Sequence, residues 1–397
     1  SRHATLLKRG LDGEVPGYSA TRLRTSTTGI MMDNLQNGSF GSLMASTGWQ
    51  FPTTLQPGNW DAMKTAHPTL ARVGTIGCES CHGAGSQHPM SGAPSSMTVQ
   101  YTSDNCLSCH HNLPNVRPGA QWESSGHGNA VWSNSFRNRP GNNSLSDCVR
   151  CHDGRAYINF TNGLGTNTNQ DVYSQREHVN ISCQSCHDSH KGGLRATPVG
   201  SDTLSNGYSY ASFNAGAGKT CMDCHKYRAN GNTLVNANLS AHWGPHYGGI
   251  ADVLLGKNGY TFGAEIPSSV AHQFVQNSCV GCHMAQPAAE HRNKMGEHTF
   301  KMSYKDDNNV QHDLVQPCVT CHSGITKFSD IVAAQDYDGD GQIKSFVEEF
   351  DGLFTQLKMA LPPVGQPTVN WQEIDNANIT QKGAYYNYRY INYEKSK

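Results

Sequence analysis

The fourteen cysteines of the chain fall into seven pairs of the form C-x-x-C, and a histidine follows the second cysteine of every pair. No cysteine is left over. With 20 histidines among 397 residues, seven such neighbours are not a product of composition. The seven motifs are Cys78/Cys81/His82, Cys106/Cys109/His110, Cys148/Cys151/His152, Cys183/Cys186/His187, Cys221/Cys224/His225, Cys279/Cys282/His283 and Cys318/Cys321/His322.

This spacing fits covalent attachment of haem. Two thiols separated by two residues can form thioethers to the two vinyl groups of one haem, and the adjacent histidine reaches the iron. A zinc ribbon needs two such pairs per metal, so an odd number of pairs leaves one unmatched. A dithiol enzyme normally carries one motif, and a disulfide framework does not fix the histidine. The sequence therefore predicts seven c-type haems with the motif histidines as proximal ligands.

A second ligand for each iron has to come from the histidines outside the motifs. Those we favour follow a tryptophan on a short helix, flank a motif or lie in a short aromatic stretch: His67, His88, His127, His178, His190, His242, His272 and His298. A second group consists of His3, His111, His246, His291 and His312. The methionines show no repeated relation to the motifs, so bis-histidine ligation is expected. His190 is too close to His187 to reach the opposite face of the same haem, and we expect it to bind a neighbouring one.

The elements that carry the motifs should be short helices joined by turns. Hydrophobic residues make up 36% of the chain and charged residues only 15%, so polar loops bury too little apolar surface to offset their ordering entropy. The predicted fold is mostly irregular coil with short α-helices and little β structure around a haem-dominated core. We expect a cap or subunit-contact segment at 1–60, a seven-haem domain at 61–330, and a C-terminal segment at 331–397.

The C-terminal segment contains the strongest helix signal. Apolar residues recur there at three- and four-residue intervals, and two prolines follow them: Phe346, Phe350, Leu353, Leu357 and Leu361, then Pro362 and Pro363. In the aromatic tail beyond, Tyr386, Tyr388 and Tyr390 alternate as in a β-strand. Such a strand would add to a sheet edge or a partner surface. A tail folded back on its own subunit is the other interpretation.

An acidic loop precedes the predicted helix. Its oxygen-bearing residues alternate as in the first part of a calcium loop, with a glycine for the turn. The acid that should close the loop at position twelve is replaced by Val347. The predicted calcium ligands are Asp336, Asp338, Asp340, Gln342 and Glu348. A solvated acidic turn that caps the helix is the alternative.

The net charge and the place of haem attachment limit the expected location and partners of the protein. The formal charge is −1, and haem propionates would make the loaded protein acidic, so nucleic acid is not an expected partner. Haem is attached outside the cytoplasmic membrane, so the chain is expected to be exported. No apolar run is long enough to span a membrane, and every cysteine is already assigned, which argues against a lipid anchor. We expect an extracellular or cell-surface protein, with the periplasm as the alternative.

The motifs, Cys78-Glu-Ser-Cys-His-Gly-Ala-Gly-Ser-Gln-His88, Ser240-Ala-His-Trp-Gly-Pro, His298-Thr-Phe and the D-x-D-G-D-G loop together resemble multihaem c-type cytochromes of metal-reducing bacteria. The resemblance covers roughly residues 60–390. Among these cytochromes, the chain is similar to extracellular members, some of which polymerise into haem-lined filaments. It implies an electron conduit for redox proteins or extracellular acceptors, with axial histidines sometimes donated by an adjacent subunit.

Two classes of function remain open. One is a non-enzymatic conductor in which every iron has two protein ligands. The other is a multihaem oxidoreductase of the nitrite, hydroxylamine or tetrathionate type, in which one iron keeps an open site. Nitrite reductases of that kind often replace one motif histidine by lysine, and no motif here does so. The conductor is the favoured interpretation.

Overall fold

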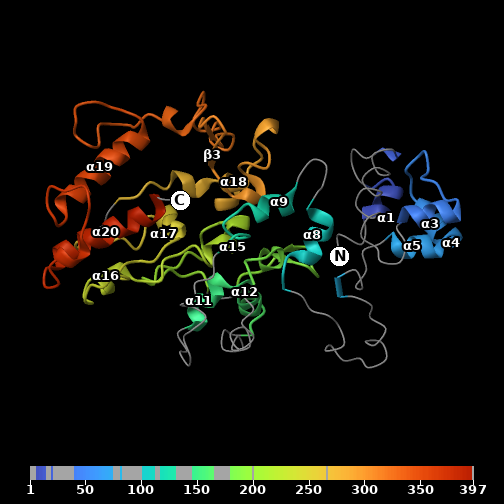
Figure 1. Cartoon of the computed structure of the whole chain (residues 1–397), viewed down its shortest axis with the longest axis horizontal. Coiled ribbons are helices and arrows are strands. Elements are labelled where there is room, and N and C mark those ends of the chain that lie inside the picture. The colour runs from blue at the N-terminus through green and yellow to red at the C-terminus, as the bar shows by residue number, and fades with distance from the viewer. Residues whose placement is uncertain are drawn as a thin grey trace. The chain divides into compact units, whose positions relative to one another are not determined.

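The computed structural model describes residues 6–14, 19–20, 40–74, 81–82, 101–111, 117–130, 145–164, 179–198, 201–264 and 267–395. Within these ranges the chain consists of short helices, turns and irregular segments, with two small two-stranded sheets (Figure 1). The predicted fold class is therefore confirmed. The chain divides into two compact units, Ser1–Arg195 and Ala196–Lys397. The division into a cap, a haem domain and a C-terminal segment stays a prediction.

The N-terminal unit carries four of the seven motifs. Its helices are α1 (Leu6–Leu11), α3 (Phe40–Thr47), α4 (Asn59–Ala66), α5 (Pro68–Val73), α8 (Asp104–His110), α9 (Pro118–Glu123), α11 (Leu145–His152), α12 (Gly154–Thr161) and α14 (Cys183–Cys186). A hairpin of β1 (His187–Asp188) and β2 (Gly193–Leu194) follows α14. The cysteine pairs on α8, α11 and α14 confirm that short helices carry these motifs.

The first helices of this unit form a small apolar core. Leu11, Trp60 and Leu70 are buried together with neighbouring apolar residues of α1, α4 and α5. The buried Asp12 carboxylate accepts a hydrogen bond from the Trp60 amide at 3.0 Å, which fixes the end of α1 against α4. Residues before 60 therefore pack on residues immediately after 60.

The C-terminal unit carries the other three motifs. Its helices are α15 (Lys219–Met222), α16 (Gly231–Leu234), α17 (Ile250–Leu255), α18 (Cys279–His283), α19 (Phe346–Ala360) and α20 (Ile379–Lys395). Short 3-10 turns are η4 (Gly216–Gly218), η5 (Ala271–Phe274), η6 (Ala289–His291), η7 (Glu297–Thr299), η8 (Phe328–Asp330) and η9 (Trp371–Glu373). Strands β3 (Ser303–Lys305) and β4 (Gln311–Asp313) pair as an antiparallel hairpin.

Helix α19 confirms the helix predicted before the two prolines. Ser345 caps it, and the Ser345 and Glu348 side chains form a reciprocal capping box. The helix ends at Ala360, directly before Leu361 and the prolines. Its apolar face is only partly covered, because Phe354 is buried while Phe346 is 54% exposed.

The predicted strand in the tyrosine-rich tail is wrong, because these residues form helix α20. The buried tyrosines are Tyr385, Tyr386, Tyr390 and Tyr393, a spacing that places them on one side of a helix. Tyr385, Tyr386 and Tyr390 pack with Tyr227 and Trp243 in the core of the C-terminal unit, and Tyr393 packs against Tyr247. The tail therefore folds back on its own subunit.

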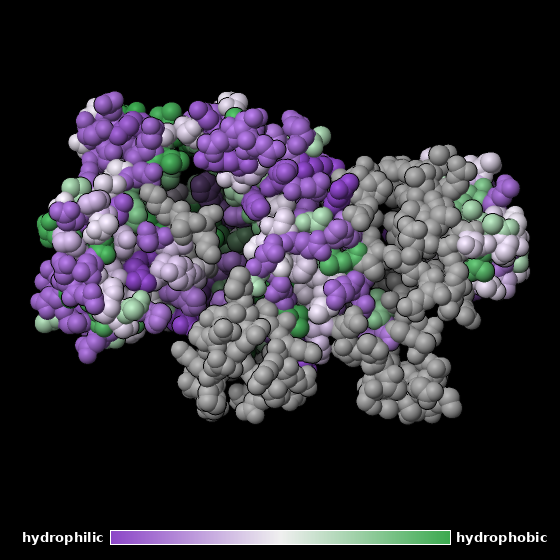
Figure 2. Space-filling model, viewed as in Figure 1, coloured by the Kyte–Doolittle hydropathy of each residue, from purple (hydrophilic) through white to green (hydrophobic). Residues whose placement is uncertain are grey.

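The described surface is mostly polar. Hydrophilic residues dominate the visible face in Figure 2, in keeping with a mean hydropathy of −0.58. Of the helices within the described ranges, none is both long enough and apolar enough to cross a membrane.

Candidate haem sites

Each motif that the structure describes lies on or beside a helical turn. In α11 and α18 the first cysteine, the second cysteine and the histidine occupy positions i, i+3 and i+4, which share one helix face. The cysteines whose side chains are described form no disulfide bond. This donor set fits a haem held by two thioethers and a proximal histidine. Cys78 lies outside the described residues.

The second and third motifs lie at the C-terminal ends of their helices. Cys109 is the penultimate residue of α8 and Cys151 the penultimate residue of α11, and each is followed by its motif histidine at the helix end. Cys151 is half-buried. The helices predicted for these two motifs are therefore confirmed, whereas haem attachment through Cys109 and Cys151 stays a prediction.

The fifth and seventh motifs differ from the predicted helices, because their second cysteines and histidines lie in turns. Helix α15 ends at Met222, before Cys224 and His225. The Cys224 amide at 3.2 Å and the His225 amide at 2.9 Å both donate to the Cys221 carbonyl. A helix is thus wrong for these motifs, since a single hydrogen-bonded turn already brings the three donors of a motif together.

The turn of the seventh motif has the same hydrogen bonds. The Cys321 amide at 3.0 Å and the His322 amide at 2.8 Å donate to the Cys318 carbonyl, and Cys321 is exposed. The backbone therefore gathers the predicted donors without a regular helix. The haem role of the turn residues Cys224, His225 and Cys321 stays a prediction.

Motifs far apart in sequence touch in the N-terminal unit. A hydrogen bond with the Cys106 thiol lowers the pKa of Cys183 to about 7, although burial opposes the shift. The Cys183 amide also donates to the Ser103 hydroxyl at 3.1 Å, across 80 residues of sequence. A thiol converted to a thioether no longer titrates, so the lowered pKa matters here as a sign of contact between the second and fourth motifs.

The third motif packs against the start of the fourth. The Gly154 amide donates to the Val179 carbonyl at 2.8 Å, and the Val179 amide donates to the Asp153 carboxylate at 3.1 Å. A Cβ atom at Gly154 would lie only 2.3 Å from the Asn180 carbonyl oxygen. Only glycine allows the two segments to approach this closely.

The three motifs of the C-terminal unit also form a contiguous set. A hydrogen bond with the Cys221 thiol lowers the pKa of Cys279 to about 6, against the opposing effect of burial. Burial raises the pKa of Cys282, and the nearby Cys318 thiol raises it further. The sixth motif therefore lies between the fifth and the seventh.

Two of the predicted distal histidines face motif histidines. The rings of His82 and His190 have centres 6.0 Å apart and planes within 5° of parallel. The rings of His272 and His322 have centres 6.4 Å apart and planes at 47°. Two histidines on one metal, each with a metal–nitrogen bond of about 2 Å, hold their ring centres on the order of 6 Å apart. Both separations fit an axial pair on one iron.

Four more of the favoured histidines lie among the described residues. His67 lies half-buried between α4 and α5, and His127 lies half-buried in the turn after α9, where burial lowers its pKa. His242 is exposed beside the buried Trp243, and His298 is half-buried in η7. His88 and His178 lie outside the described residues.

The second group of histidines has other hydrogen-bonding partners. The His111 Nε2 atom lies 2.7 Å from the Glu123 carboxylate, and His246 Nδ1 accepts from the Tyr247 amide at 2.6 Å. His3 lies outside the described residues. These contacts orient the His111 ring towards Glu123 and the His246 ring towards the Tyr247 backbone.

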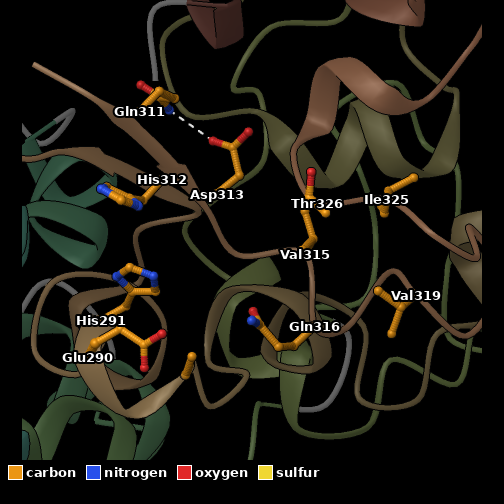
Figure 3. Close-up of a pocket in the computed structure, with 11 residues that line it drawn as sticks. Glu290, His291, Gln311, His312, Asp313, Val315, Gln316, Val319, Ile325 and Thr326 are labelled. Carbon is orange, nitrogen blue, oxygen red and sulfur yellow. Dashed lines mark hydrogen bonds between the residues drawn. The ribbon is translucent and has the colours of Figure 1, made fainter.

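His291 and His312 line a pocket of about 490 Å³ beside the seventh motif (Figure 3). Their ring centres are 4.7 Å apart. His291 Nδ1 lies 2.9 Å from the Tyr304 hydroxyl, and His312 Nε2 lies 3.1 Å from the Asp306 carboxylate. Hydrogen bonds therefore hold both rings in a polar cluster.

The acidic loop folds as a compact turn before α19. Ligand oxygens of Asp336, Asp338 and Asp340 can all lie within 4.8 Å of one another. The Lys344 ammonium donates to Asp338 at 3.1 Å and to Asp340 at 2.6 Å, and these hydrogen bonds raise the pKa of Lys344. The Gln342 amide donates to Asp340 at 2.9 Å. The three aspartates therefore lie close enough together to hold a metal ion, with the Lys344 ammonium at one side, and the calcium site stays a prediction.

The predicted closing ligand, Glu348, belongs to the helix cap, and its calcium role stays a prediction. Glu348 turns back to the Ser345 amide and hydroxyl in the capping box. Glu349 instead accepts hydrogen bonds from the Lys344, Asp338 and Tyr337 amides, which lower its pKa despite the opposing effect of burial. The S-x-x-E pattern that begins at Ser345 was the sequence signal that reserves Glu348 for the cap.

Comparison with known proteins supports the chemistry of the motifs. No known protein-family profile matches the chain. Over 178 residues it is 29% identical to the C-type polyheme cytochrome OmcB of Geobacter sulfurreducens, in sequences from two strains. The match covers 40% of this chain and 22% of that protein. The chain is a multihaem c-type cytochrome. The cytochrome spans about a fifth of the length of these relatives.

Two solved structures are loosely similar to the cytochrome. Outer cell wall cytochrome OcwA gives a TM-score of 0.35 at 17% identity, over 64% of this chain and 55% of that one. The undecaheme cytochrome from the S-layer of Carboxydothermus ferrireducens gives a TM-score of 0.40 at 17% identity, over 81% of this chain and 48% of that one.

Proposed function

We propose that this cytochrome conducts electrons between redox partners through haems attached at all seven motifs, with two histidines on each iron. The contact between attachment sites of different motifs carries the proposal. The Cys106 and Cys183 side chains lie next to each other, as do those of Cys221 and Cys279. Sites that touch bring the redox groups they hold into the short range that electron transfer requires.

The facing histidines favour a conductor over an oxidoreductase. His190 stands opposite His82, and His272 stands opposite His322. A second histidine on an iron occupies the position that a substrate would need. We extend this ligation to the irons of the other motifs, with His67, His127, His242 and His298 among the donors.

The function is tested on the purified holoprotein. We expect an intact mass equal to the polypeptide plus seven haems, and an entirely low-spin spectrum that carbon monoxide leaves unchanged after reduction. The bare polypeptide mass, or zinc in place of iron, contradicts the proposal. A native high-spin haem that turns over nitrite or hydroxylamine would replace the conductor by the oxidoreductase.

A matched pair of variants checks the ligand assignment. In His272→Ala, one of the seven haems should become high-spin and bind carbon monoxide, because the iron held beside His322 loses its sixth ligand. In His291→Ala the spectrum should stay low-spin, because that ring is bound to Tyr304. A His272→Ala spectrum that stays entirely low-spin, like that expected for His291→Ala, excludes His272 as a ligand.

The proposal includes calcium at the acidic loop. Asp336, Asp338 and Asp340 would supply carboxylate oxygens to the ion, and Lys344 would be displaced from them. Calcium at about 100 times its Kd should then stabilise the protein by about 2.7 kcal/mol. The measurement is thermal unfolding with calcium and with a chelator, and Asp338→Asn should lose the difference. Identical unfolding curves for the unmodified protein exclude the site.

We also propose an extracellular or cell-surface location and self-association into a filament. Apolar side chains stand exposed near the start of α19, with Val332 at 68%, Ile343 at 58% and Phe346 at 54% exposure. Groups of exposed apolar residues often mark contact surfaces. Electron microscopy of the purified protein tests the self-association, since monomers alone contradict a filament.

A further inference from the structure

The hairpin after the fourth motif presents a histidine at its tip. His187 begins β1 in an extended conformation, with ψ of 130°, and leads the chain away from the attachment turn. His190 lies in the exposed turn between β1 and β2. Its ring stands 6.0 Å from that of His82, the motif histidine of the first attachment site.

His190 cannot serve the iron that its own motif holds. It follows His187 by three residues, and three residues span about 10 Å at most. That length is too short to carry the chain from one face of a porphyrin, around its edge, to the iron on the other face. An iron bound to His190 must therefore belong to another motif.

The turn that presents His190 is fixed by its own backbone. One oxygen of the Asp188 carboxylate accepts hydrogen bonds from the His190 and Lys191 amides, each at 3.0 Å. The Gly192 amide donates to the Asp188 carbonyl at 2.7 Å, and Gly192 has a φ of +70°. The histidine therefore occupies a defined position although its side chain is exposed.

The segment directly before the second motif contacts both the first and the fourth motifs. The Gln184 side chain donates to the Thr102 carbonyl at 3.1 Å, next to the contact between Cys183 and Ser103. Two residues further on, the Asn105 side chain donates to the Cys81 carbonyl at 2.9 Å. One short segment, residues 102–105, thus ties the base of the hairpin to the first attachment site.

We infer that the first attachment site is completed by the fourth motif, with His190 as the distal ligand of the iron that His82 holds. The inference rests on the proposed function. The first and fourth sites are then direct neighbours in space. The order of the sites in space therefore differs from the order of the motifs in sequence. The nearly parallel rings also define the electronic character of this iron, because parallel imidazole planes give a rhombic low-spin resonance signal.

The test combines His190→Ala with removal of single attachment sites. In the full holoprotein, His190→Ala should keep seven haems by mass and convert one to a high-spin form that binds carbon monoxide. In a background that lacks the first site, Cys78→Ala with Cys81→Ala, adding His190→Ala should create no high-spin haem. In the matched background that lacks the fourth site, Cys183→Ala with Cys186→Ala, it should still create one.

The opposite pattern, with a new high-spin haem only while the fourth site is present, overturns the inference. So does a fully low-spin His190→Ala protein. If a background variant is not matured, electron paramagnetic resonance of the single variant decides, because the lost signal must be rhombic. Failure of the proposed function is distinct, since it shows in the unmodified protein as missing haems or carbon monoxide binding.

Discussion

Replacing Tyr386 with alanine is expected to lower the free energy of unfolding of the C-terminal unit by about 3–5 kcal/mol, the usual cost of truncating a buried aromatic side chain. Tyr386 is 0% exposed. Its ring packs edge-on against Trp243 at 6.1 Å, and its hydroxyl donates to the Ala229 carbonyl at 3.3 Å. A Cβ atom on Gly231 would lie 2.7 Å from this ring, so the site leaves little room to rearrange.

Hydrogen exchange of the α20 amides in the holoprotein measures this effect on the helix itself. The α20 amides should exchange faster in Tyr386→Ala than in the unmodified protein, by the factor that corresponds to the lost free energy of unfolding. Ile379→Ala is the matched control on the same helix, because Ile379 is 47% exposed and exposed positions usually change stability by less than about 0.5 kcal/mol. Equal exchange in the two variants would show that α20 is held by other contacts.

Replacing Glu349 with alanine is expected to release the acidic loop from α19. Its carboxylate accepts from the Tyr337 amide at 2.7 Å, the Lys344 amide at 2.9 Å and the Asp338 amide at 3.1 Å. Removing one acceptor group therefore leaves three backbone donors without their partner, and unsatisfied donors are costly. The melting temperature should fall, and calcium affinity should fall with it.

Ser345→Ala is the comparison for this variant. It removes the helix cap but leaves the loop acceptor in place, at an expected cost of about 1 kcal/mol. Thermal unfolding should show a larger loss for Glu349→Ala than for Ser345→Ala. The reverse order would mean that the capping box, and not the Glu349 carboxylate, holds the loop in place.

Local patterns were readable from the sequence where the responsible residues are neighbours. The C-x-x-C-H motifs specify their own turns, and the apolar spacing before Pro362 predicts α19. In the tail, the same tyrosines satisfy two periods. Tyr386, Tyr388 and Tyr390 alternate as in a strand, yet burial of Tyr385, Tyr386 and Tyr390 against Tyr227 and Trp243 selects the helix. Packing against distant residues decided between the two patterns.

The pairing of histidines depends on contacts that sequence order does not contain. His272 lies near the sixth motif in sequence, but its ring faces His322 of the seventh. His190 reaches His82 because hydrogen bonds from residues 102–105 hold both segments. No local spacing encodes such long-range contacts, so the sequence identified the pool of donors and excluded the haem of its own motif for His190, but did not identify the pairs.

The segment at the fourth motif contacts the other three attachment sites of the N-terminal unit, and these contacts determine which routes electrons can take. It meets the first site through His190, the second through Ser103 and the third through the backbone around Gly154. The first and second sites also touch directly, through Asn105. The third site also meets the second, because the Arg155 guanidinium lies 5.1 Å from the centre of the Tyr101 ring. Under the proposed function, electrons in the N-terminal unit therefore have more than one route, and loss of any one of these four sites leaves the other three in contact.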